Sequence, residues 1–137
     1  MQPLSANDKL HVQSWLAIAD LDLRVAERMY AEDAPFYGYH VPFACQQAVE
    51  KYAKAVLVAY QLPVRRTHDL PALLQQLTSV VTFSTIELDQ ADLLADYAVD
   101  IRYPPHQQLA LSEVLEALTI TRHFSGILRP LAQAFLI

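Results

Sequence analysis

Apolar residues recur three or four positions apart through most of the chain, which is the spacing of one face of an α-helix. The first such stretch runs from Asn7 to about Asp33. Its apolar face consists of Val12, Trp15, Leu16, Ala19, Leu23, Ala26, Met29 and Tyr30. Either Asn7 or Ser5 offers a side chain that can cap the N-terminus. The pattern predicts one long first helix.

A loop and a second helix follow. Residues 34–40 lack periodicity and contain proline and glycine, so they are predicted to form a loop. Pro42 then falls where the first turn of a helix tolerates proline, and Pro63 stops the helix after about Gln61. The apolar side of this second helix carries Ala44, Ala48, Ala55 and Val58.

Two shorter helical patterns come next. A third helix opens at residues 67–70, with either Thr67 or Asp69 as its cap, and its leucine-rich face ends near Val81. Ser84 and Glu87 have the spacing of a capping box, which predicts that a fourth helix begins there. The tandem prolines at 104–105 must end it. Its inward side is expected to carry Ile86, Ala91, Leu94, Ala98 and Ile101.

A fifth helix is predicted from about Gln108. Its apolar positions are Leu111, Val114, Leu115, Leu118 and Phe124. Gly126 and Pro130 are expected to bend or break it. The predicted fold class is all-α, an up-and-down bundle of four to five helices, with residues 1–137 forming a single domain.

Composition narrows the functional classes. The 137 residues are 53% hydrophobic and 18% charged, and 10 basic against 15 acidic residues give a net charge of -5. This balance argues against binding to duplex DNA but leaves room for a local basic pocket. The single cysteine, Cys45, excludes an internal disulfide and fits a reducing cytoplasm. No targeting segment or membrane-length apolar run is apparent, so we expect a cytoplasmic protein that does not enter a membrane.

The second helix carries a first set of candidate functional residues. Gln46 and Glu50, Glu50 and Lys54, and Gln47 and Lys51 are each four apart, so they form adjacent polar rows. The favoured interpretation from composition alone is a solvated face with a stabilising Glu-to-Lys pair. Cys45, in the middle of this helix, is expected to be a buried, inert thiol.

Two other segments offer candidate chemistry. His68 at the start of a helix would expose a neutral imidazole, although a simple capping role is the more common one. Arg102 could clamp a phosphate while Tyr103 stacks on a base, or it could merely complement the helix dipole. The other histidines His11, His40 and His123 have no neighbouring partner types, and no metal-ligand spacing is present, so we expect neither a metal nor a cofactor.

Taken together, these segments resemble the HEPN family of small all-α domains. The resemblance covers nearly the whole chain. It rests on Trp15, Ala19, Leu21 and Ala26 in the first helix, an aromatic loop, Phe43 with Gln46-Gln47-Ala48-x-Glu50-Lys51-x-x-Lys54-Ala55, Thr67-His68-x-Leu70, and Arg102-Tyr103-Pro104. It implies a bundle that pairs as a homodimer and binds nucleotides or RNA. It also implies a partner, a minimal nucleotidyltransferase, in a two-component module of toxin–antitoxin type.

A large branch of the family cleaves RNA without a metal. Its signature is an arginine, a polar residue, and a histidine after four to six intervening positions. Here only Tyr-Pro-Pro separates Arg102 from His106, and the residue after the arginine is aromatic. We therefore expect a binding module, with an endoribonuclease using Arg102 and His106 as the alternative. The expected ligand site is a locally basic pocket of Arg102, Tyr103, Lys51, Lys54 and His68.

Overall fold

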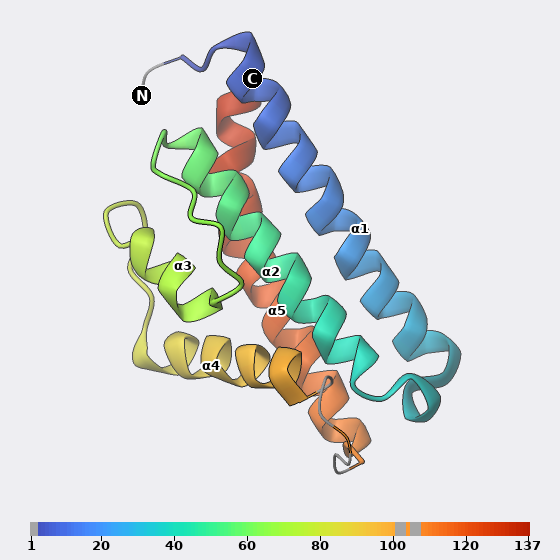
Figure 1. The fold of residues 1–137 in the computed structure, drawn as a ribbon. Helices are drawn as coiled ribbons and strands as arrows, with labels where there is room; N and C mark the ends of the chain where they lie inside the picture. Colours follow the sequence, from blue (N-terminus) through green and yellow to red (C-terminus); the bar gives the residue numbers. More distant parts are fainter. Residues whose placement is uncertain (1–2, 101–103, 105–107) are drawn as a thin grey trace.

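The computed structural model describes residues 3–100, 104 and 108–137, and within them the chain forms five α-helices and no strand (Figure 1). The helices are α1 (Ala6–Tyr37), α2 (His40–Ala59), α3 (Leu70–Gln76), α4 (Thr85–Asp100) and α5 (Leu111–Gln133). A turn of 3-10 helix, Ala134–Leu136, follows α5. The prediction of an all-α bundle is confirmed.

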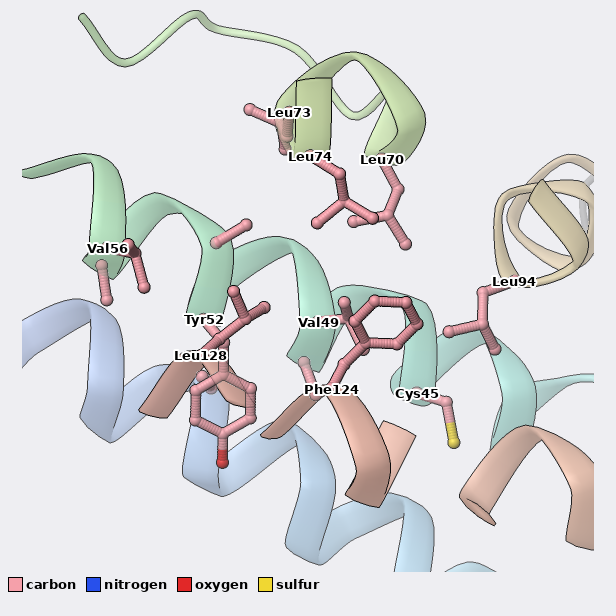
Figure 2. Close-up of a cluster of buried hydrophobic side chains, with 14 of the residues drawn as sticks. Cys45, Val49, Tyr52, Val56, Leu70, Leu73, Leu74, Leu94, Phe124 and Leu128 are labelled. Atoms are coloured by element: carbon pink, nitrogen blue, oxygen red, sulfur yellow. The ribbon is translucent and has the colours of Figure 1, made fainter. Parts of the chain in front are cut away.

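Helix α2 lies at the centre of the bundle. It packs against all four other helices, with α1 and α5 as long neighbours and α3 and α4 on another side (Figure 1). Figure 2 shows Val49 and Tyr52 of α2 among leucines of α3 and Phe124 and Leu128 of α5. Because α2 has neighbours on so many sides, most of its residues are buried, polar ones included.

The N-termini of α1, α3 and α4 are capped by residues that the sequence indicated. Ser5 rather than Asn7 caps α1, since its Oγ accepts the Asp8 N–H at 3.1 Å. Asp69 rather than Thr67 caps α3, through the Ala72 N–H at 3.2 Å. The capping box before α4 is confirmed: Glu87 Oε1 accepts the Ser84 N–H at 2.8 Å, and Ser84 Oγ accepts the Glu87 N–H at 3.1 Å.

One predicted interruption is shorter than expected, and a second does not break its helix. Helical structure continues to Tyr37, beyond a kink at Asp33 (φ -162°, ψ 79°), so most of the expected loop at 34–40 is helical. Asp33 Oδ1 accepts the Phe36 N–H at 3.2 Å and thereby caps the extra turn, in which Pro35 is tolerated. Helix α5 runs through Gly126 and Pro130, so these residues do not break it. Its buried face continues on both sides of them, and this packing outweighs their weak helix propensity.

The predicted inward faces of α4 and α5 need correction. Ile86 is 71% exposed, Leu111 is 53% exposed and Leu115 is 43% exposed. All three lie in the first two turns of their helices, where the neighbouring helices do not cover them. Ala98 is half-buried, and Ile101 lies outside the described residues. In the described part of the chain, no helix combines the length and apolarity needed to cross a bilayer.

Candidate functional site

The polar row of α2 is buried. Gln46 is 0% exposed, Glu50 1% and Lys54 8%. The prediction that this row is a solvated face was therefore wrong. The reason lies in the topology: α1 covers one flank of the row, and the segment between α2 and α3 turns back and covers the other.

Glu50 is the centre of a network that joins α2 to the segment before α3. One carboxylate oxygen, Oε1, accepts hydrogen bonds from Lys54 Nζ at 3.1 Å and from Nδ1 of His68 at 2.7 Å. The other oxygen, Oε2, is buried and has no hydrogen-bond partner among the described residues. A buried acceptor without a donor is costly.

His68 is fixed in place from two directions. Its backbone carbonyl accepts the side-chain amide of Gln46 at 3.2 Å, and Gln46 in turn accepts that of Gln47 at 2.7 Å. Its ring binds Glu50 through Nδ1, yet the side chain is 74% exposed. In the tautomer in which Nδ1 donates to the carboxylate, Nε2 is the nitrogen left for a ligand. His68 is thus no helix cap, because Asp69 fills that position.

Lys54 completes the network on the α1 side. Its Nζ lies 5.4 Å from the centre of the Trp15 ring, in a cation–π contact. The buried ammonium is therefore held between an aromatic face and the Glu50 carboxylate. We call Gln46, Glu50, Lys54 and His68 the α2 polar cluster.

The other predicted site residues lie elsewhere. Lys51 faces α1, where its Nζ binds Asp22 Oδ2 at 2.6 Å, so it does not join the α2 polar cluster. Lys51 and Lys54 are both paired with carboxylates, and neither presents an uncompensated charge. Arg102, Tyr103 and His106 lie outside the described residues.

A second polar network, absent from the sequence predictions, ties three long helices together. Asp20 of α1 accepts hydrogen bonds from Tyr52 OH at 2.5 Å and from Arg129 Nε and Nη2 at 3.0 and 2.9 Å. The Arg129 hydrogen bond lowers the pKa of Asp20, and burial raises the pKa of Tyr52 to about 12. The three residues are distant in sequence, so no local pattern could have revealed this contact.

A second carboxylate–histidine pair joins α4 to α5. His123 Nε2 lies 2.7 Å from Glu87 Oε2, and the imidazole is half exposed. Hydrogen bonds lower the pKa of Glu87: the one from the Ser84 backbone N–H has the largest effect, and the one from His123 comes next. The sequence around His123 offers no partner, and its partner in the fold comes from another helix.

Cys45 is buried, as predicted, and burial raises the pKa of its thiol to about 11. A thiol with such a pKa is almost entirely protonated at neutral pH and is a poor nucleophile. In the described ranges, no three His, Cys, Asp or Glu side chains come together in a way that could hold a metal ion.

Comparison with known proteins identifies relatives of the whole bundle. A family model described as HEPN domain matches residues 12–130. The crystal structure of TT1696 from Thermus thermophilus is similar with a TM-score of 0.77 at 24% identity, covering 88% of this chain and 97% of that one. The structure of ST0689, described as an archaeal HEPN homologue, has a TM-score of 0.69 at 19% identity over 96% of this chain and 99% of that one. No curated protein matches the sequence.

Proposed function

Because the chain belongs to the HEPN domain family, we propose that it binds a nucleotide or RNA. In this proposal His68, Arg102 and Tyr103 contact the ligand. Lys54 and Lys51, which the sequence also indicated as ligand-binding residues, are paired with Glu50 and Asp22 and contribute no free charge. The observation that carries the proposal is the hydrogen bond between Glu50 and His68. It holds an exposed imidazole in one orientation by means of a carboxylate that is 1% exposed.

Burying this carboxylate is expensive, and a purely structural role would be served as well by apolar packing. The arrangement does confer a fixed direction on His68. Lys54 offsets the charge of Glu50, so the imidazole is oriented without being surrounded by net negative charge. When protonated, Nε2 donates a charge-assisted hydrogen bond to a phosphate oxygen. A guanidinium at Arg102 would bind a phosphate in bidentate fashion, and Tyr103 would stack on a base.

The test is a binding titration by fluorescence anisotropy, with a labelled single-stranded RNA and with unlabelled AMP as competitor. We expect both ligands to bind wild-type protein, and His68→Ala and Arg102→Ala to weaken both. His123→Ala is the matched control, because His123 also binds a glutamate at 2.7 Å but lies on α5. Loss of affinity in the control equal to that in His68→Ala would contradict the assignment of the site.

We further propose that the protein is a homodimer and one half of a two-component, toxin–antitoxin type module with a minimal nucleotidyltransferase. Support for the dimer comes from α1, where Ile18, Leu21 and Val25 are 43%, 59% and 41% exposed. Their spacing of three and four places them on one side of the helix, where a second copy would bury them. Co-purification of the two proteins from cells that express both would support the nucleotidyltransferase partnership, and separate elution would contradict it.

A metal-independent endoribonuclease is the second candidate function. The Glu50–His68 pair favours it, because a carboxylate-held histidine is suited to general acid–base catalysis. In this case Arg102 would stabilise charge on the phosphorane and His106 would transfer a proton. Degradation of a structured RNA in the presence of EDTA, abolished by His106→Ala, would establish this activity. We expect no cleavage by the isolated protein.

A further inference from the structure

The segment between α2 and α3 carries two arginines that no function described above uses. Arg65 and Arg66 are consecutive, both are exposed, and His68 follows two positions later. We propose that this segment, residues 63–68, is the surface that contacts the phosphodiester backbone of single-stranded RNA. The inference rests on the proposed function and specifies its ligand as a nucleic-acid chain rather than a mononucleotide.

The backbone of this segment is held at both ends by buried or half-buried amides. Gln46 Nε2 donates to the carbonyl of His68 at 3.2 Å, and Gln76 Nε2 donates to the carbonyl of Pro63 at 3.3 Å. Figure 1 shows the segment running back alongside α2 toward the start of α3. The two arginines are therefore carried by a backbone with fixed ends, which lowers the entropic cost of binding.

The two arginines are not held in ion pairs by the described residues. Lys51, Lys54, Arg122 and Arg129 each lie within 4.0 Å of a carboxylate. Within the described part of the chain, neither Arg65 nor Arg66 has such a partner. The nearest acid in sequence, Asp69, caps α3 and keeps its negative charge. Residues 63–69 thus carry two arginines against one carboxylate, a locally positive stretch on a protein whose net charge is -5.

The spacing of these groups favours a chain of phosphates over a single one. The backbone turns at these residues, because the Thr67 N–H donates to the Arg65 carbonyl at 2.9 Å. Arg65, Arg66 and His68 therefore present three separate donor side chains from one short turn, a set that suits successive phosphates of a chain better than one phosphate. Arginine contacts of this kind bind the backbone without reading sequence, and each reduces affinity at high salt through counterion release.

The experiment measures the affinity of a labelled ten-nucleotide RNA as a function of salt concentration, with AMP binding measured in parallel. The variants are Arg65→Ala/Arg66→Ala and, as control, Arg24→Ala/Arg28→Ala. The control removes the same charge from two exposed arginines one turn apart on α1. Light scattering confirms that each variant keeps the molecular mass of the wild type.

For single strands, each neutralised phosphate contributes about 0.7 to the slope of log affinity against log salt. We expect Arg65→Ala/Arg66→Ala to reduce that slope by about 1.4 while AMP binding persists, and the control to leave the slope unchanged. An unchanged slope in Arg65→Ala/Arg66→Ala, or an equal reduction in that variant and in the control, would overturn the inference without contradicting nucleotide binding. Equal binding of a polyglutamate peptide would assign the surface to an acidic protein and overturn it as well. Failure of the wild type to bind either AMP or RNA would contradict the proposed function itself.

Discussion

The carboxylate of Glu50, buried in the central helix, accepts a hydrogen bond at 2.7 Å from the ring of His68, whose side chain is 74% exposed. This contact links the interior of the bundle to its surface. It holds the segment before α3 against α2 and orients one imidazole toward solvent. The stability of the fold and the proposed binding site therefore depend on the same carboxylate.

Replacing Glu50 by alanine should lower the free energy of unfolding. Glu50→Ala would leave the ammonium of Lys54, which is 8% exposed, without its anionic partner. Breaking a buried ion pair from one side typically costs about 3–5 kcal/mol of folding free energy. Urea unfolding followed by circular dichroism measures the change. Asp22→Ala, which breaks the more exposed pair with Lys51, should cost less than about 1 kcal/mol. Equal costs for the two variants would refute the account of the α2 polar cluster.

Acid should destabilise the protein in part through Asp20. Its folded-state pKa is lowered, chiefly by Arg129, so its contribution to stability is present above the ordinary carboxyl pKa near ~4 and is lost as the pH falls through the lower folded value. Asp20→Asn should therefore flatten the dependence of unfolding free energy on pH below about 4. Asp89→Asn, an exposed change on α4, should keep the wild-type slope. Identical slopes for wild type and Asp20→Asn would count against this assignment.

Cys45 should be unreactive in the folded protein. Its thiol is buried and its pKa is raised to about 11, so little thiolate exists at about pH 8. We expect a thiol-specific reagent to label the native protein far more slowly than the protein in urea. Labelling at the unfolded rate in native buffer would show that the centre of the bundle opens readily.

The exposed row on α1 gives a test of the dimer. Leu21 is 59% exposed, so Leu21→Glu should fold normally while placing a charge in the proposed interface. Light scattering should report a dimer for wild type and a monomer for the variant. A wild-type monomer at tens of micromolar, well above a ~micromolar dissociation constant, would contradict the proposal.

The sequence was most informative where the structure is local. Periodicity located the five helices, and Ser84 with Glu87 located the start of α4, because both signals lie within a few residues. Burial of the α2 row could not be predicted, since it follows from the path of residues 60–69 back across α2. The helical turn after Asp33 was missed although its signal is local. Asp33 accepts the Phe36 N–H three residues later, but Pro35 and Gly38 in the same stretch favoured a loop. The pairs of His68 with Glu50 and of His123 with Glu87 join separate elements, and only the folded chain reveals them.

The most direct test of the central claim follows the histidine ring signals by NMR during titration with single-stranded RNA. The chain has five histidines, which His→Gln variants would assign. We predict that the ring signals of His68 shift as RNA is added, while those of His123, held by Glu87 in the same manner, stay in place. Binding of RNA that leaves the His68 signals unmoved would contradict the site.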